Sequence, residues 1–362
     1  MTRLCHHTLT LLGVTALSLT SLGCFPVFVP SKPDSPTEDL SFEYIDGDEA
    51  SDNYLLELRI NGPILHRDVG PGFLGVDSGV TYAYAFQRVL EKAAEDDRVA
   101  GILLRLSTPG GTIVGSSVIY QALEDYKAET GNPIVAYVDG ISASGGVWTM
   151  VAADEIYAAP GSIVGSIGVI GPSFVYFDDP IAVDGGLLGG GVTTRNGIQQ
   201  FIISAGKGKD LGNPFRLPTE EELQVLQRNI ANEYDNFVAH VAATREIPEA
   251  QIRDEMGAYI FDTETAEALG LIDGTDYQEA AIAALATRAE LDDDFQLVRV
   301  ERSTPSLLAV LLGQAPTARA DETLQAQIEQ DLCDMTTQAM LVYYGNVSTL
   351  CPAWYFPQQQ QL

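Results

Sequence analysis

The residues from Val138 to Met150, VDGISASGGVWTM, constrain the fold of this chain more than any other stretch. An apolar run stops at Asp139-Gly140, and small residues then lead into a second apolar run that is typical of a helix. Gly145 and Gly146 place no side chains beside Ser144, so a substrate backbone can approach it. A helix that starts here directs free backbone N–H groups at a developing oxyanion. The stretch predicts a nucleophilic serine; the alternative is a small-residue turn that only packs closely.

Strands and helices alternate on both sides of this turn. Tyr54–Ile60 and Val99–Leu106 read as apolar strands, and Thr81–Asp96 and Ile113–Glu129 have the spacing of helices. Thr219-Glu220-Glu221-Glu222 forms a capping box that opens a further long helix. This alternation predicts an α/β architecture with crossover units.

The N-terminus has the features of a secretory signal. Arg3 precedes an apolar core, Leu9–Leu22, which is too short for a comfortable membrane span and ends just before Cys24. Leu-Gly-Cys resembles a bacterial lipobox, which predicts a signal peptide over residues 1–23 and lipidation of Cys24. Ser21 departs from the leucine usual at that position, so ordinary signal cleavage or an uncleaved anchor are the alternatives. Residues 24–52, rich in proline and acidic residues, read as a tether.

The charge balance bears on partners. The chain has 20 Lys+Arg against 50 Asp+Glu, a net charge of −30. Nucleic-acid binding needs a basic surface, so nucleic acid is not an expected partner.

The C-terminal part differs in character from the rest. After about Leu291 a charge run leads into a mixed segment, which predicts an appended C-terminal extension over residues 291–362. It holds Cys333 and Cys351, and in an oxidising compartment the expectation for such a pair is a disulfide, with two free thiols as the alternative.

A serine nucleophile needs a base, and histidine and lysine are the candidates. Of four histidines, two fall in the signal, and neither His66 nor His240 lies in a recognisable catalytic turn. Two histidines also make no convincing metal cluster, so no metal is expected. Lys207 and Lys209 stand apart in a glycine-rich loop. A lysine acts as a base only where burial or neighbours lower its pKa from about 10.4; the alternative for this loop is an exposed turn.

A second glycine turn could supply oxyanion donors. Pro109-Gly110-Gly111 follows a buried strand and precedes a helix, so its backbone N–H groups are free to face a substrate carbonyl. A plain strand-to-helix turn is the alternative.

Together these segments resemble signal peptide peptidase A and its relatives, serine peptidases of the Clp protease/crotonase-like fold. The resemblance covers roughly Tyr54 to Ala286 and rests on motifs in the family's order. They are Ser107-Thr108-Pro109-Gly110-Gly111, Ser142-Ala143-Ser144-Gly145-Gly146, Gly165-Ser166-Ile167-Gly168-Val169-Ile170, Gly208-Lys209-Asp210 shortly before Pro214, and the closing run Phe261–Asp273.

The resemblance assigns roles to the site residues. Ser144 resembles the family's nucleophile, Lys209 its general base and Ser166 the serine that orients that lysine. Gly110 and Gly111 match the loop that supplies oxyanion N–H groups, and Gly145 is expected to contribute a third. Ser144 is preferred over Ser142 because the double glycine follows it, and Lys209 over Lys207 because of its spacing to Pro214. No metal or cofactor is implied.

The resemblance also implies a spiral of ββα units and assembly of subunits in rings. The serine and lysine of one site can come from neighbouring subunits or repeats. Because this chain carries one copy of each motif, a homo-oligomer is expected. The lipoprotein-like signal, the glycine-rich segment Phe174–Ser204 and the C-terminal extension depart from the family's pattern.

The sequence thus predicts a serine endopeptidase with a Ser-Lys dyad in residues 53–290. It would be an exported bacterial cell-envelope protein, lipid-anchored and facing the periplasm. Its expected substrates are extended apolar peptides such as signal-peptide remnants or membrane-associated proteins. One alternative is an inactive relative that acts as an oligomeric peptide-binding scaffold. Another is an acyl-CoA-processing enzyme of the same fold, against which export counts.

Overall fold

The computed structural model describes residues 40–68, 79–174, 176, 202–301, 318–346 and 350–351. The predicted signal peptide, Cys24 and most of the predicted tether lie outside the described residues, as does most of the glycine-rich segment Phe174–Ser204. Among the residues described, no helix has the length and apolar character needed to cross a bilayer.

A nine-stranded, mostly parallel sheet forms the centre of the molecule. Its strand order is β1-β12-β2-β5-β7-β8-β11, and β9 pairs with both β7 and β10. β5 and β7 lie in the middle because their apolar runs can be buried on both faces, as parallel strands require. The strands are β1 (Phe42–Gly47), β2 (Tyr54–Asn61), β5 (Val99–Thr108), β7 (Ile134–Ala143), β8 (Glu155–Ala158), β9 (Ile163–Gly165), β10 (Ile260–Asp262), β11 (Gly274–Thr275) and β12 (Gln296–Val300).

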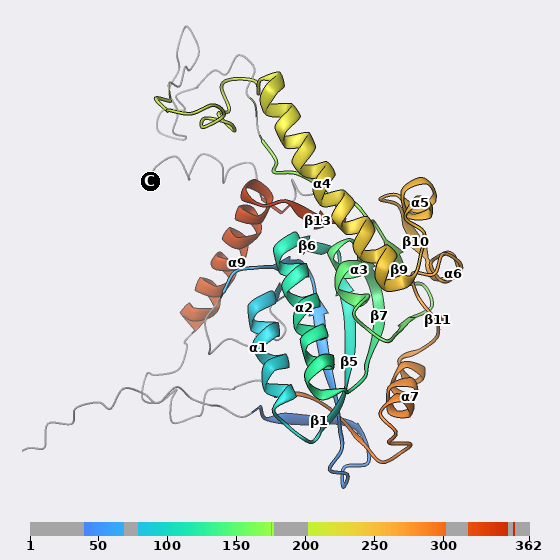
Figure 1. The fold of residues 1–362 in the computed structure, drawn as a ribbon. Helices are drawn as coiled ribbons and strands as arrows, with labels where there is room; N and C mark the ends of the chain where they lie inside the picture. The colour runs from blue at the N-terminus through green and yellow to red at the C-terminus, as the bar shows by residue number, and fades with distance from the viewer. Residues whose placement is uncertain are drawn as a thin grey trace, which may run out of the picture. The chain divides into compact units, whose positions relative to one another are not determined.

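Helices cover both faces of this sheet (Figure 1). Alternate residues of β5 face opposite ways: Ile102 joins the apolar cluster under α1 (Ala83–Ala94), α2 (Ile113–Thr130) and α3 (Gly145–Met150). Leu103 joins the cluster under α7 (Gln278–Arg288). This alternation is the consequence of successive strand side chains pointing to opposite faces.

A second, four-stranded sheet lies beside the first, in the order β13-β6-β3-β4. Its strands are β3 (Ile64–Leu65), β4 (Thr81–Tyr82), β6 (Gly110–Thr112) and β13 (Leu341–Tyr343). Only Pro109 separates β5 from β6, and α2 follows at once, with Thr112 as its N-cap. β5, β6 and α2 therefore form one ββα unit. The predicted α/β architecture with crossover units is confirmed.

The long helix predicted after Thr219 is α4 (Glu220–Arg245), of 26 residues. Its capping box is confirmed: the Thr219 hydroxyl accepts from the Glu222 N–H, and the Glu222 carboxylate accepts from the Thr219 N–H. Only its C-terminal part is buried, through Phe237, Val238 and Val241. After it follow α5 (Glu249–Gln251), a π-helical turn (Ile252–Met256) and α6 (Thr263–Ala268).

Both ends of the described chain join the sheets. β1 falls within residues predicted as tether, yet it pairs antiparallel with β12. β12 in turn extends the parallel sheet beside β2. The predicted C-terminal extension therefore supplies β12, α9 (Ala318–Gln338) and β13, although its sequence suggested an appended region. The partners of β1, β12 and β13 lie far away in the chain, so the local sequence does not predict the pairing.

Candidate active site

Ser144 occupies the turn between β7 and α3 in a strained backbone conformation. Its φ is 56° and its ψ is −108°. The Ser144 N–H donates to the Gly165 carbonyl at 2.8 Å, and the Ser144 carbonyl accepts from the Trp148 N–H at 3.0 Å. Non-glycine residues at positive φ cost about 1–3 kcal/mol and concentrate at functional sites. The turn therefore has the geometry that presents a nucleophile between a strand and a helix.

The two candidate serines have different surroundings. The Ser142 hydroxyl donates to the Met150 Sδ at 3.2 Å, which ties it to the body of α3. The Ser144 hydroxyl faces the Gly168 carbonyl, at 3.4 Å. This arrangement favours Ser144 as the reactive group and gives Ser142 a packing role. Ser144 is nevertheless fully buried within this chain.

The predicted oxyanion glycines come together. A Cβ placed on Gly110 would lie 2.5 Å from the Gly145 nitrogen, so the two backbones are in direct contact. Gly110 has φ of +93°, which favours glycine. A Cβ on Gly111 would lie 2.0 Å from the Ile64 carbonyl oxygen, because β6 packs against β3. The Gly110 N–H donates to the Thr108 hydroxyl at 3.0 Å, which leaves the N–H groups of Gly111 and Gly145 as the oxyanion donors to consider.

Ser166 lies beside this turn. β9 pairs with the end of β7 so that Gly165 stands opposite Ala143. Ser166 follows at once, nearly buried and with φ of 62°. Its N–H donates to the Tyr259 carbonyl at 2.6 Å. Ser144 and Ser166 thus follow the ends of two paired strands, and both have positive φ.

Lys209 is placed elsewhere. It is exposed, in the loop that precedes α4, and within the described part of the chain its ammonium has no hydrogen bond or ion pair. Neighbouring Lys207 pairs with Glu221 at 3.0 Å. At 1.5 Å per residue, α4 carries the chain about 30 Å from Thr219 to His240, the residue that bonds the Trp148 carbonyl of α3. Figure 1 shows this loop at the outer end of α4. The structure therefore does not bring Lys209 to Ser144 of the same chain.

Arg216 fixes the shape of the loop that carries Lys207 and Lys209, called the lysine loop below. Its guanidinium bonds Asp210 and Glu222, each at 2.8 Å. The hydrogen bond from Arg216 lowers the pKa of Asp210, and the same partner lowers the pKa of Glu222 to about 2. Both carboxylates are consequently charged at neutral pH, and they tie the loop to the first turn of α4.

Neither described histidine serves Ser144. The His66 ring contacts the Thr112 hydroxyl at 3.2 Å. His240 bonds the Trp148 carbonyl at 3.0 Å and stacks on the Trp148 ring. Burial lowers the pKa of His240, with the carbonyl contact opposing it, so the ring is neutral. Among the residues that the structure describes, a Ser-His-Asp triad therefore finds no histidine base.

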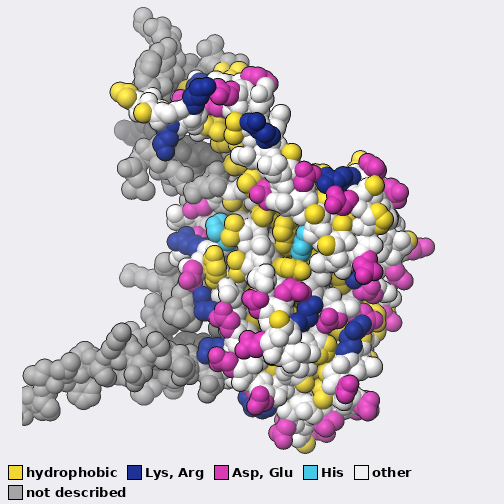
Figure 2. Space-filling view, in the orientation of Figure 1, with side chains coloured by type: hydrophobic (Ala, Val, Ile, Leu, Met, Phe, Trp, Pro, Cys, Tyr) yellow, Lys and Arg dark blue, Asp and Glu magenta, His cyan; other side chains and the backbone are white. Residues whose placement is uncertain are grey.

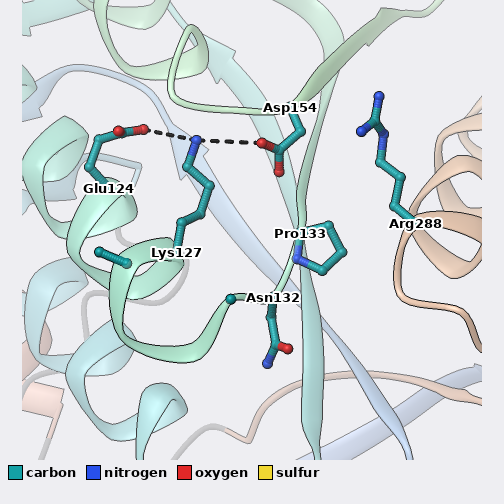
Figure 3. A pocket seen from close by; sticks show the side chains of 8 residues that line it. Glu124, Lys127, Asn132, Pro133, Asp154 and Arg288 are labelled. Atoms are coloured by element: carbon teal, nitrogen blue, oxygen red, sulfur yellow. Dashed lines mark ion pairs between the residues drawn. The ribbon is translucent and has the colours of Figure 1, made fainter.

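A surface pocket of about 660 Å³ lies at the other end of β7, where Asn132 and Pro133 precede the strand (Figure 3). Ligands in open α/β sheets bind at the carboxyl ends of strands, where Ser144 lies. In the pocket, Lys127 pairs with Glu124 at 2.9 Å and with Asp154 at 3.5 Å. Burial alone would lower the pKa of Lys127, but these two carboxylates raise it. The pocket thus offers a charged lysine rather than a base.

One element at the site was not predicted from the sequence. β13 pairs antiparallel with β6, the strand that carries Gly110 and Gly111. The run Met340-Leu341-Val342-Tyr343-Tyr344, apolar and rich in strand-forming residues between the two cysteines, is the signal that indicates such a strand. Cys333 and Cys351 form a disulfide in the structure, and β13 lies within the loop that it closes.

Comparison with known proteins places the chain in a family. The sequence pattern of peptidase family S49 matches residues 126–292, which include Ser144, Ser166 and Lys209. A candidate protease of Methanocaldococcus jannaschii is 33% identical over 57% of this chain and 61% of its own length. A candidate signal peptide peptidase SppA of Enterococcus faecium is 30% identical over 67% of this chain and 66% of its own. A candidate protease of Synechocystis sp. is 32% identical over 56% of this chain and 68% of its own length.

The chain thus spans about two thirds of the length of these relatives. Among solved structures, a ClpP1 mutant from Listeria monocytogenes is 10% identical and superposes on 62% of this chain and 94% of its own with a TM-score of 0.37. A TM-score of 0.37 is too low to show a shared fold. The sequence matches show the family: the chain belongs to peptidase family S49.

Proposed function

We propose that the protein is a serine endopeptidase in which Ser144 of one chain works with Lys209 of a second copy. The observation that carries this proposal is the contact between the strained Ser144 turn and the Gly110 turn. It gathers a hydroxyl and backbone N–H groups at the end of the parallel sheet. Membership of a peptidase family supports the same chemistry.

The placement of Lys209 supports a site shared between chains. Its loop is exposed at the outer end of α4, where apolar side chains are also left uncovered. Leu217, Leu223 and Val225 are 64%, 40% and 43% exposed. Figure 2 shows hydrophobic side chains at the surface along α4, while acidic ones are spread over the rest of this face. A second copy that covers this part of α4 would bury the apolar surface and carry the lysine loop to its neighbour's serine.

The proposed chemistry needs only protein groups. Desolvation at the interface favours the neutral amine of a lysine, which then takes the proton from the Ser144 hydroxyl. The serine oxygen attacks the peptide carbonyl, and the N–H groups of Gly111 and Gly145 stabilise the oxyanion. The lysine ammonium then protonates the leaving amine, and water resolves the acyl-enzyme by the same route. Ser166 would orient the lysine.

The proposed location and substrates rest on the sequence. Residues 1–23 would direct export, and lipidation of Cys24 would hold the protein to a bacterial membrane, facing the periplasm. A site built from strand edges and small residues suits extended apolar peptides, such as signal-peptide remnants or segments of membrane-associated proteins.

A second candidate is an inactive, oligomeric peptide-binding scaffold. Two observations favour it: Ser144 is fully buried within the chain, and the lysine loop lies at the far end of α4. The two candidates differ in one respect only, because the scaffold would bind peptides without cutting them.

Hydrolysis of an apolar peptide separates them. The enzyme would be the chain from residue 24 onward with Cys24→Ser, compared with its Ser144→Ala, Lys209→Ala and Lys207→Ala variants at matched oligomeric state. We expect the first two variants to lose activity and Lys207→Ala to retain it. An assembled parent chain that cuts nothing, or a Ser144→Ala chain that cuts equally well, would favour the scaffold.

A further inference from the structure

β13 has strand partners on both sides. On one side Leu341, Val342 and Tyr343 stand opposite Thr112, Gly111 and Gly110 of β6 in antiparallel register. On the other side Leu341 exchanges both backbone hydrogen bonds with Ile170, each at 2.9 Å. Ile170 lies four residues after Ser166. β13 is therefore a strand inserted between the two segments that flank the candidate site, and Figure 1 shows it next to β6, far in sequence from it.

The hydrogen-bond pattern places one carbonyl of β13 in the candidate oxyanion site. Tyr344 N–H donates to the Pro109 carbonyl at 2.7 Å, and Ile113 N–H donates to the Met340 carbonyl at 3.3 Å. Hydrogen-bonded pairs alternate along an antiparallel ladder, so the bonded pair between these two is Gly111 with Val342. The Gly111 N–H, a candidate oxyanion donor, is consequently directed at the Val342 carbonyl.

The second glycine turn meets the same carbonyl. A Cβ on Gly145 would lie 3.0 Å from the Val342 oxygen, and one on Gly110 would lie 2.1 Å from it. The Val342 oxygen thus sits against both turns that were predicted to bind a substrate carbonyl. This is the position that a scissile carbonyl would need, and the chain's own backbone fills it.

The strand also closes access to the nucleophile. Leu341 and Val342 are fully buried, and so is Ser144. Val342 packs in the same apolar cluster as Val147 of α3. A peptide could pair with β6 and reach Ser144 only after β13 has left its place.

Two connections hold β13 where it is. The disulfide Cys333–Cys351 spans 18 residues and joins α9, before the strand, to the chain after it. α9 is itself anchored by buried Asp331, which pairs with Arg67 and accepts from the Tyr82 hydroxyl at 3.0 Å. Because both ends of the strand are tied to one anchored helix, β13 has little freedom to move away.

We propose that residues 340–344 form an internal strand that occupies the peptide-binding edge of β6, with Val342 where the residue before a scissile bond would lie. The Cys333–Cys351 disulfide latches this strand, so the strand competes with substrate, and the opened chain binds substrate more tightly than the closed chain. This proposal rests on the peptidase function proposed above for the occupied site. The peptide that fits the opened site is extended and apolar, with a small branched side chain at the position of Val342.

Binding of a labelled peptide tests the proposal without any need for catalysis. The probe is a fluorescein-labelled Ala-Met-Leu-Val-Tyr-Tyr peptide, the sequence of residues 339–344, and the parent is the chain from residue 24 with Cys24→Ser and Ser144→Ala. Tyr344→Pro removes the N–H that bonds Pro109, and Tyr344→Ala is the matched control that keeps it. A third variant, Cys333→Ser with Cys351→Ser, opens the latch. Circular dichroism checks that each folds.

We expect fluorescence anisotropy to show peptide binding at least about tenfold tighter for Tyr344→Pro and for the double cysteine variant than for the parent. Tyr344→Ala should stay within about threefold of the parent. Unchanged or weaker binding in the Tyr344→Pro chain would overturn the proposal, since β13 would then be a permanent wall of the site. Should the cysteine variant fail to fold, the two Tyr344 variants decide.

The same strand-opening substitutions, made in the chain that keeps Ser144, separate the proposed internal strand from the proposed peptidase function. If the opened chains bind the peptide tightly and cut nothing, the internal strand stands and the Ser-Lys peptidase fails. If all chains cut equally and peptide binding does not change, the peptidase stands and the internal strand fails.

Discussion

Replacing Gly145 by alanine tests how closely the two glycine turns are packed. The added Cβ would lie 2.4 Å from the Ser116 Oγ, 3.0 Å from the Val342 oxygen and 3.1 Å from the Gly110 Cα. The backbone of Gly145 has no positive φ, so the cost is contact rather than strain. The Ser116 hydroxyl is the only one of these three groups that can rotate. It donates to the Thr112 carbonyl at 3.1 Å, and that bond is lost if it turns away.

The magnitudes follow from these contacts. Overpacking a buried site costs about 1–3 kcal/mol, so we expect Gly145→Ala to lower the free energy of unfolding by about 2 kcal/mol. Ser116→Ala alone should cost about 1 kcal/mol, the contribution of one buried hydrogen bond. The double variant removes the closest clash, so its cost should fall short of the sum by about 1 kcal/mol or more.

Urea unfolding of the four chains measures this coupling, and peptide hydrolysis provides a second readout. If the Gly145 N–H stabilises the oxyanion, Gly145→Ala should lower kcat by up to about a hundredfold, and the added Ser116→Ala should recover part of the loss. Additive costs in unfolding would refute the reasoning, because they would mean that Ser116 and the start of α3 do not touch.

Two further predictions concern the packing around the site. Burial lowers the pKa of His240 from 6.5, so the unfolded chain takes up a proton first as pH falls, and stability is lost below about pH 6.5. We expect His240→Gln to flatten this loss in thermal unfolding between about pH 8 and about pH 5; an unchanged slope would contradict a buried neutral ring. Asp331→Ala removes the carboxylate that accepts from the buried Tyr82 hydroxyl and should cost about 1–3 kcal/mol in urea unfolding. The exposed control Glu329→Ala should cost less than about 0.5 kcal/mol, and equal costs would show that the anchor of α9 is weak.

The central strands and turns could be predicted from sequence because their signals are local. The apolar run of β5 and the capping box at Thr219 each fix one element without help from distant residues. The Ser144 turn could be located in the same way, because small residues between a strand and a helix leave few other conformations. Its strain and its contact with Gly110 could not, since both depend on how β6 is packed.

The strands at the edges of the two sheets could not be predicted from local sequence patterns. β1 has the acidic sequence FEYIDG, which reads as a solvated tether until β12 is placed beside it. Strand preference depends on such neighbours more than on the residues themselves. β13 is the same case, since its partner β6 precedes it by more than two hundred residues.

The position of the base is a separate matter. A motif in the sequence assigns Lys209 a role, but it does not say which chain's serine the lysine meets. The structure of one chain places Lys209 at the exposed end of α4 and Ser144 in the core. In the proposed shared site, contacts between chains join them, and such contacts are encoded in surface complementarity rather than in local pattern.

Complementation between inactive chains tests the shared site most directly. A Ser144→Ala chain still carries Lys209, and a Lys209→Ala chain still carries Ser144. When the two are co-expressed with different tags and the mixed oligomer is isolated, random assembly should pair an intact serine with an intact lysine at about a quarter of the sites. We predict peptide hydrolysis at about a quarter of the parent rate for the mixture and none for either variant alone. A mixed oligomer that contains both chains and cuts no peptide would contradict a dyad formed between neighbouring copies.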